Sequence, residues 1–296
     1  MEFKNWMSEK IKKIEEHLGT IIKEEENPQK IIYQSMNYSL MSGGKRLRPV
    51  LLLGAYEIFQ ENTDAVIPFA CAMEMIHTYS LIHDDLPAMD NDDYRRGRLS
   101  NHKKFGEATG ILAGDGLLNR AFETALEATL NGKTDVKSSV RALYEIAKSS
   151  GADGMIGGQV VDMYGHEKIS SIEDLKYMYS LKTGAIIKSS VVAGAILGGA
   201  NEAEVVAFEQ YAEKLGIAFQ IEDDILDVTS TQEILGKPIG SDVANDKITY
   251  LSFVDIEEAK KQVKQFTEQA IESLNIFGDK AIYMVELAKY LTKRDH

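Results

Sequence analysis

Residues 77–96 read HTYSLIHDDLPAMDNDDYRR, an apolar helix-like run that ends in a dense group of acidic side chains. Five aspartates fall within ten residues and two arginines follow at once: Asp84, Asp85, Asp90, Asp92 and Asp93, then Arg95 and Arg96. Carboxylates this close repel one another, so a helix end that needed only solubility would gain nothing from them. Oxygen ligands at the end of a buried helix suit Mg²⁺, which takes one or two carboxylates together with substrate phosphates. The adjacent arginines suit phosphate oxygens.

A second acidic cluster, in LGIAFQIEDDILDVTS (215–230), argues against a solvated acidic turn, which would be the preferred interpretation of one Asp-Asp pair alone. Its polar members recur at i, i+3, i+4 and i+7 and so form one stripe on a helix: Gln220, Asp223, Asp224 and Asp227. The other positions are mostly apolar, which predicts a largely buried helix where unpaired carboxylates would be costly. A cation is therefore expected opposite this stripe.

Upstream, SGGKRLRPVLLL (42–53) places three cations between a glycine pair and an apolar helix. The glycines can end a helix and let backbone approach a ligand closely. The cations are Lys45, Arg46 and Arg48, and they lie beside the free N–H groups of a helix start. This combination predicts a phosphate site, although an ordinary basic helix cap is equally open for the motif alone.

The helix that leads into the first acidic cluster carries a polar face. His77, Ser80 and Asp84 are spaced i, i+3 and i+7 and so share one side. A lone buried histidine is usually a core residue, but one in line with a metal cluster is expected to touch substrate. Pro87 should end the helix, so that Asp90 returns towards Asp84 through a distorted last turn.

Three further segments carry polar residues of interest. A helix expected at 172–198 is interrupted by Lys182-Thr183-Gly184, which predicts a kink with an inward cation, a surface lysine being the alternative. GGQVVDM (157–163) places Gln159 and Asp162 where they could bond substrate-binding cations. Two lysines that follow turn residues further on are available for a diphosphate: Lys237 and Lys247.

Composition and periodicity predict an all-α fold. The chain has 296 residues, 44% of them hydrophobic, and only five prolines, between which lie segments too long and too rich in helix formers for strands. Helices are expected at about 5–24, 28–41, 104–131, 133–150 and 172–198, with two more between about 255 and 294. No linker, low-complexity tract or repeat divides the chain, so residues 1–296 are interpreted as one domain.

Charge and cysteine content limit the class of function. Lys and Arg number 33 against 46 Asp and Glu, a net charge of −13, which is unfavourable for nucleic-acid binding. Cys71 is the only cysteine, so an intrachain disulfide is excluded and a reducing, cytoplasmic location fits. The charged N-terminus does not read as a signal peptide. The most apolar run, Ala185 to Ala200, falls short of ~20 residues and is expected to be a buried helix rather than a stable membrane insertion.

The order of these motifs resembles the trans-isoprenyl diphosphate synthases. The resemblance rests on GGKRLRP, DDLPAMD, KTG, FQ-x-x-DD with DDILD, and GKP-x-GSD, and it extends from about Tyr38 to Tyr250. Within that family, the first motif, Asp-Asp-x₄-Asp with an internal proline, is similar to that of bacterial farnesyl diphosphate synthases. The resemblance implies an isoprenoid synthase bundle of roughly ten or more helices around a deep central cavity, and a homodimer.

Residue roles are implied by the resemblance, position by position. It implies about three Mg²⁺ ions per active site, replaceable by Mn²⁺. The expected metal ligands are Asp84, Asp90 and Asp223, supported by Asp85, Asp224 and Asp227. The expected holders of the isopentenyl diphosphate are Lys45, Arg48, His77 and Arg96. The expected holders of the allylic diphosphate are Arg95, Lys182, Lys237 and Lys247, with Thr183 and Gln220 lining the reacting centre.

The implied reaction is head-to-tail condensation of isopentenyl diphosphate with dimethylallyl and geranyl diphosphate. Metal ions and basic side chains would neutralise the leaving pyrophosphate, an allylic cation would form, and the double bond of isopentenyl diphosphate would attack it. The implied product is (2E,6E)-farnesyl diphosphate. Two departures from the family pattern concern loops: Arg98-Leu99-Ser100 replaces the commoner Lys-Pro-Thr, and Leu251 stands where proline is usual.

Product length has one candidate determinant in the sequence. Tyr79 lies five residues before Asp84, which places it ~7–8 Å below the expected metals along the helix. A rigid aromatic there would stop a chain that grows tail first down the cavity, and Ser80 is the neighbouring candidate. A core tyrosine with no such role is the alternative.

The sequence is also compatible with two other functions. Geranylgeranyl diphosphate synthesis is the nearest, and a non-catalytic regulatory subunit of a prenyl synthase is one of a different class. A class I terpene cyclase would not need GGKRLRP and DDILD. A His-Asp phosphohydrolase would need paired histidines, which the six histidines do not provide.

Overall fold

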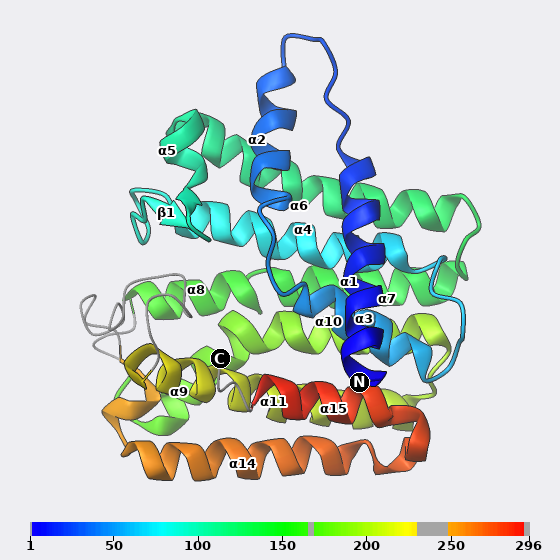
Figure 1. Cartoon of the computed structure of the whole chain (residues 1–296), viewed down its shortest axis with the longest axis vertical. Helices are drawn as coiled ribbons and strands as arrows, with labels where there is room; N and C mark the ends of the chain where they lie inside the picture. Colours follow the sequence, from blue (N-terminus) through cyan, green and yellow to red (C-terminus); the bar gives the residue numbers. More distant parts are fainter. Residues whose placement is uncertain (1, 165–168, 230–247, 293–296) are drawn as a thin grey trace.

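The computed structural model describes residues 2–164, 169–229 and 248–292, and this part of the chain is almost entirely helical (Figure 1). The first part contains α1 (Glu2–Ile21), α2 (Lys30–Leu40), α3 (Leu47–Glu57), α4 (Ile67–Asp84), the short strands β1 (Tyr94–Arg95) and β2 (Arg98–Leu99), α5 (Asn101–Phe105) and α6 (Glu107–Leu130). Then come α7 (Val136–Ser150), α8 (Met155–Tyr164), α9 (Ile172–Tyr179), the turn η1 (Ser180–Gly184), α10 (Ala185–Gly198) and α11 (Glu202–Thr229). The chain ends in η2 (Tyr250–Ser252), α14 (Ile256–Ser273), η3 (Asn275–Ala281) and α15 (Ile282–Leu291). The predicted all-α class is confirmed.

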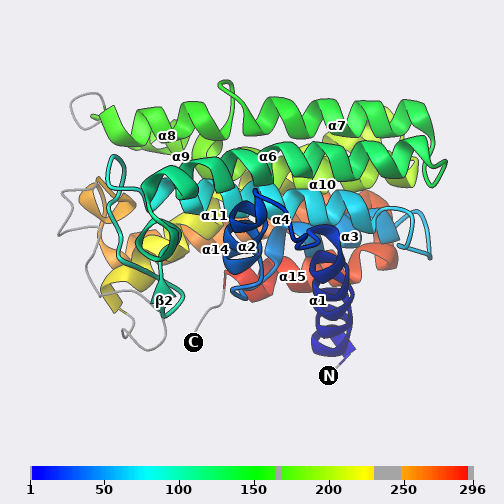
Figure 2. The same cartoon turned by 90° about the horizontal axis from the view of Figure 1, so that it is seen from above.

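The helices that carry the two aspartate clusters lie inside the bundle. Helix α4 packs against α6, α3 and α10, and α11 packs against α14 and α10. Both views place the strand pair, α8 and α9 at one end of the bundle (Figures 1 and 2). Figure 2 also shows α7 and α8 forming an outer layer, with α6 and α10 beneath it.

The apolar helix that could have been taken for a membrane span belongs to the core. The stretch Ile172–Gly198 is long and apolar enough to cross a membrane by composition, yet 67% of its most apolar window is buried inside the protein. Helix α10 uses alanine, glycine and serine to pack closely against α3, α7 and α11. The expectation of a buried helix rich in small residues is confirmed.

Some helix boundaries differ from the sequence prediction. Helix α2 starts at Lys30 rather than at Pro28, because Pro28 lies in the preceding turn. The segment expected as one helix from 104 is two, since Gly106 has a φ of +88° and separates α5 from α6. The distortion predicted at Lys182-Thr183-Gly184 is present as η1, a single π-helical turn.

Candidate active site

The first aspartate cluster forms around the end of α4. The helix stops at Asp84, and the backbone N–H of Asp90 donates to the Asp84 carbonyl at 2.8 Å, so the loop containing Pro87 folds back on the helix end. The predicted return of Asp90 is thus confirmed. Burial and the neighbouring Asp90 carboxylate raise the pKa of Asp84 to about 6, against the attraction of Lys182. A bound cation would relieve this crowding.

The second aspartate of this cluster is held by an arginine from the strand pair. Asp85 is buried and accepts from Arg95 Nε at 2.9 Å and also from an Nη2 hydrogen of Arg95. Arg95 additionally lies 3.5 Å from Asp92. Burial raises the pKa of Asp85, and the bonds from Arg95 oppose that shift. Arg95 therefore fixes the strand pair to the C-terminal end of α4.

The basic stretch after α2 separates into cations with different surroundings. Arg46 is buried, pairs with Glu74 on α4 at 2.7 Å and donates to the Leu40 carbonyl at 3.0 Å. Arg46 is also the N-cap of α3 and has a left-handed backbone conformation, with a φ of +49°. Lys45 is exposed and Arg48 is partly buried. Arg46 is therefore a structural cation, held by Glu74 and the end of α2.

Arg48, His77 and Arg96 lie close enough to influence one another's pKa. Burial lowers the pKa of Arg48 to about 10, with Arg96 acting in the same direction and Glu74 and Asp223 opposing it. Burial, followed by the charges of Arg48 and Arg96, lowers the pKa of His77 well below its ordinary value. A neutral His77 beside two arginines is a concentration of hydrogen-bond donors that suits a diphosphate. The influence of Asp223 on Arg48 links this group to α11.

The four side chains of the polar stripe on α11 differ in how deeply they are buried. Gln220 and Asp223 are partly buried, whereas Asp224 and Asp227 are buried. Asp224 accepts from the Tyr179 hydroxyl and from the Tyr250 backbone N–H, the latter at 2.7 Å. Asp224 thus connects α11 to the end of α9 and to η2. Tyr179 was not predicted, and its only signal in the sequence is an aromatic residue three positions before Lys182.

The π turn lies between the two aspartate clusters. Lys182 extends to α8, where its Nζ is 2.5 Å from Asp162 Oδ2, and it is also attracted by Asp84 and Asp90. The next residue, Thr183, donates to Gln220 Oε1 on α11 at 2.9 Å. The expected link between Asp162 and a cation is therefore present. A cavity of about 100 Å³ opens here, lined by residues that include Lys182, Thr183, Gln220 and Asp224.

Tyr79 and Ser80, the two candidates for the control of product length, both lie on α4. Tyr79 is buried, its ring centroid is 5.7 Å from that of His83, and its hydroxyl has no hydrogen-bond partner within the described chain. Ser80 donates to the His77 carbonyl at 2.9 Å. Lys237 and Lys247 lie outside the described residues.

The carboxylates fit Mg²⁺ that is shared with a substrate. Across residues 2–164, 169–229 and 248–292, no three His, Cys, Asp or Glu side chains come close enough to hold a metal ion unaided. Mg²⁺ normally takes one or two carboxylates and completes its shell with water and phosphate oxygens. Burial, and after it the charge of Asp90, raises the pKa of Asp84, and a bound cation would stabilise its ionised form. The donor set therefore suits metal ions that arrive with a diphosphate.

Comparisons with known proteins are consistent in sequence and in structure. A family model described as Polyprenyl synthetase matches residues 29–283. A geranylgeranyl diphosphate synthase of Cyanophora paradoxa is 45% identical over 266 residues, covering 90% of this chain and 88% of that protein. A farnesyl diphosphate synthase of Geobacillus stearothermophilus is 41% identical over 299 residues, covering 100% of this chain and 99% of that protein. An apo crystal structure of an FPP/GFPP synthase from Zymomonas mobilis superposes with a TM-score of 0.87 at 33% identity, covering 98% of this chain and 99% of that one.

Proposed function

Because the chain belongs to the polyprenyl synthetase family and is a prenyltransferase, we propose that it condenses isopentenyl diphosphate with dimethylallyl and then geranyl diphosphate, releasing pyrophosphate and (2E,6E)-farnesyl diphosphate. The observation that carries this proposal is the position of Lys182. It is attracted by Asp84 and Asp90 of the first cluster, while its neighbour Thr183 bonds Gln220 of the second. A diphosphate bound there would meet a cation and carboxylates from both motifs.

The two diphosphates are assigned to separate groups of side chains. Arg48, His77 and Arg96, with exposed Lys45, would hold isopentenyl diphosphate by charge-assisted hydrogen bonds. Lys182 and Arg95 would hold the allylic diphosphate, together with Lys237 and Lys247, and with Asp162 keeping Lys182 in place. Mg²⁺ held by Asp84, Asp90 and Asp223 would neutralise charge on the leaving pyrophosphate.

The protein's own part in the chemistry is to bind, orient and exclude water. As the allylic carbon–oxygen bond breaks, Lys182 is positioned to meet the negative charge that develops on pyrophosphate. Thr183 and Gln220 are bonded to each other, which fixes their oxygens beside the cation left behind. The new carbon–carbon bond then forms from the double bond of isopentenyl diphosphate, and the proton that is lost passes to the departing pyrophosphate.

A fifteen-carbon product is the proposed end point, with geranylgeranyl diphosphate as the alternative. Support comes from Tyr79, a buried and rigid aromatic on α4 one and a half turns before Asp84. The named relatives do not decide between the two, because one is a farnesyl and another a geranylgeranyl diphosphate synthase. Both aspartate motifs are intact, so the regulatory-subunit interpretation is not retained.

A homodimer in the cytoplasm, with residues 1–296 as one catalytic domain, completes the proposal. Helices α6 and α7 contact each other and expose large apolar side chains, which suits a second copy: Ile111, Leu112, Leu126, Leu130, Val136, Val140 and Tyr144. The one cysteine, Cys71, is buried and unpaired, so the fold needs no oxidising compartment. Sedimentation of the pure protein would test the dimer, since a monomer at micromolar concentration contradicts it.

One assay tests the reaction. The purified protein is incubated with labelled isopentenyl diphosphate, Mg²⁺ and each allylic primer in turn, and the products are sized by chromatography. Farnesyl diphosphate as the main product from dimethylallyl and geranyl diphosphate supports the proposal. A twenty-carbon main product would transfer the assignment to geranylgeranyl diphosphate synthesis.

A further inference from the structure

The strand pair β1–β2, which carries Arg95 on its first strand and Arg96 in its turn, is too short to be stable by itself. Each strand has two residues, with Tyr94 opposite Leu99 and Arg95 opposite Arg98. An isolated hairpin of this size is not stable in water, so its place must be set by contacts with the helices around it. One such contact is the bond between Arg95 and Asp85 on α4. The others come from α2.

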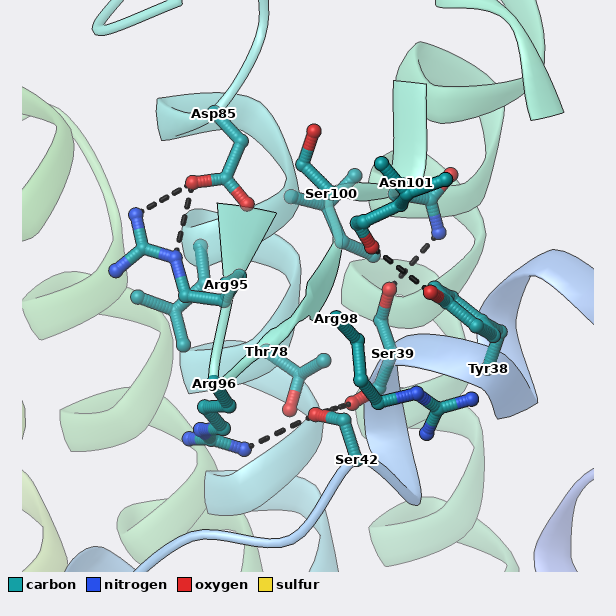
Figure 3. A pocket seen from close by; sticks show the side chains of 13 residues that line it. Tyr38, Ser39, Ser42, Thr78, Asp85, Arg95, Arg96, Arg98, Ser100 and Asn101 are labelled. Carbon is teal, nitrogen blue, oxygen red and sulfur yellow. Dashed lines mark hydrogen bonds and ion pairs between the residues drawn. The ribbon is translucent and has the colours of Figure 1, made fainter. Parts of the chain in front are cut away.

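Asn101, just after the second strand, fastens this segment to α2. It is 2% exposed and uses both ends of its amide group. Its Oδ1 accepts from Ser35 Oγ at 2.8 Å, and its Nδ2 donates to the Ser35 carbonyl at 3.0 Å and to Ser39 Oγ at 2.8 Å. Figure 3 shows Ser39 and Asn101 directed towards one another across the pocket. Tyr38, which directly precedes Ser39 on α2, donates its hydroxyl hydrogen to the Leu99 carbonyl at 2.8 Å.

The end of the same helix also contacts Arg96. The Arg96 Nη1 donates to Ser42 Oγ at 3.3 Å and to the Gly43 carbonyl, and Ser42 Oγ itself donates to the Ser39 carbonyl at 2.8 Å. The guanidinium lies so close to the next residue that a Cβ on Gly44 would be 2.7 Å from it. Arg96 is therefore seated in the turn that leads directly to Lys45.

We propose that Asn101 is a positioning residue for the isopentenyl diphosphate site, acting through α2 on Arg96. Asn101 at the start of α5 and the Tyr38–Leu99 bond attach α2 to the segment of the strand pair, and the turn after α2 receives Arg96. The amide of Asn101 therefore sets the distance between Arg96 and the cations that follow the turn. This inference rests on the proposed function, because it takes Arg96 to be a diphosphate ligand.

The test is steady-state kinetics with each substrate varied separately. Asn101→Ala is expected to raise KM for isopentenyl diphosphate by ~10-fold, with kcat and the KM for geranyl diphosphate changed by less than ~2-fold. In an Arg96→Ala background, Asn101→Ala should produce no further rise, since its effect passes through Arg96. Asn37→Ala is the matched control, because Asn37 lies on the same helix and bonds the Ile22 carbonyl at 3.1 Å, away from the strand pair.

The outcomes separate this inference from the proposed function. If Arg96→Ala leaves KM for isopentenyl diphosphate unchanged, the assignment of that site fails. If Arg96→Ala raises KM and Asn101→Ala does not, or if Asn101→Ala acts equally in both backgrounds, the positioning role is overturned. Should Asn101→Ala not fold, Ser39→Ala and Tyr38→Phe each remove one bond of the same attachment. Both should raise KM in the same direction by ~2-fold or more, and no change in either also overturns the proposal.

Discussion

Lys182 and Asp162 lie on different helical elements, yet the lysine Nζ is 2.5 Å from the carboxylate Oδ2. The pair is partly buried, so the charge of Lys182 is directed by Asp162 towards Asp84 and Asp90 rather than towards solvent. Asp162 therefore holds the Lys182 ammonium group through a charge-assisted hydrogen bond.

Replacing that carboxylate tests its role. Asp162→Asn is expected to lower kcat/KM for the allylic substrate by ~10-fold because Lys182 loses its alignment, and Lys182→Ala should lower it further. The exposed Asp153, in the turn just before α8, provides the control as Asp153→Asn. Initial rates at saturating isopentenyl diphosphate supply the measurement. Wild-type rates for Asp162→Asn would show that Lys182 needs no partner.

The two aspartate motifs should be separately essential. Asp84→Ala or Asp223→Ala is expected to lower turnover by ~10²-fold or more, about 3 kcal/mol of transition-state stabilisation, while the helical fold is kept. Chelation of divalent metal should abolish wild-type activity reversibly. Turnover and circular dichroism are measured together, with Asp115→Ala on the exposed face of α6 as the control. Near-normal turnover by either folded variant in Mg²⁺ would contradict the metal assignment.

Product length should depend on the ring of Tyr79 and not on its hydroxyl. Tyr79→Ala removes the buried ring and is expected to give products of twenty carbons or more. Tyr79→Phe keeps the ring and removes a hydroxyl that has no partner in the described chain, so it should still stop at fifteen carbons. Chromatography of the products after complete conversion distinguishes the two. If Tyr79→Ala also stops at fifteen, Ser80 becomes the candidate.

His77 should make stability depend on pH. Its pKa in the folded chain lies well below the ordinary 6.5 because of burial and the nearby arginines. The unfolded chain therefore binds a proton that the folded chain does not, and stability is lost as pH falls below the unfolded pKa. As the pH is lowered from about 8 to about 5, the free energy of unfolding of the wild type is expected to decrease relative to that of His77→Phe. Urea titrations at constant ionic strength measure this difference. A substitution of exposed His17 controls for losing a histidine, and a constant difference would mean that His77 is not held neutral.

The packing of α8 on the π turn has no room for a side chain at Gly158. A Cβ there would be 2.2 Å from the Lys182 backbone nitrogen, and backbone cannot move aside as a flexible side chain can. Gly158→Ala is expected to cost about 1–3 kcal/mol of stability and to lower allylic turnover together. Gly19→Ala is the control, since its Cβ would lie 3.9 Å from Met41 and should be tolerated or slightly stabilising. Thermal melts and initial rates of both variants provide the comparison.

Much of the fold was predictable because its signals are local. Helical periodicity, Pro87 and the distortion at 180–184 are properties of short windows, and each was anticipated within a few residues. A hydrogen bond from a cation to Asp162, which follows the glycine pair at 157–158, was anticipated as well.

What the sequence could not supply are contacts between distant segments. Arg46 and Arg48 look alike in GGKRLRP, but only the fold places Glu74 beside Arg46 and so makes it structural. The role of Tyr179 could not be predicted from its position before Lys182, because its partner Asp224 lies 45 positions away. The amide of Asn101 depends in the same way on Ser35, 66 positions earlier.

The π turn at Ser180–Gly184 changes the directions in which side chains before and after it project from the helix. Successive residues of an α-helix are ~100° apart, so one extra residue in a turn rotates everything after it relative to everything before. Helix α9 can therefore contact α8 while α10 contacts α3 and α7, and both helices also contact α11. Removing a single residue from this turn would straighten the helix and rotate one of these faces out of contact. The length of this segment is thus as strongly constrained as the identity of any side chain on it.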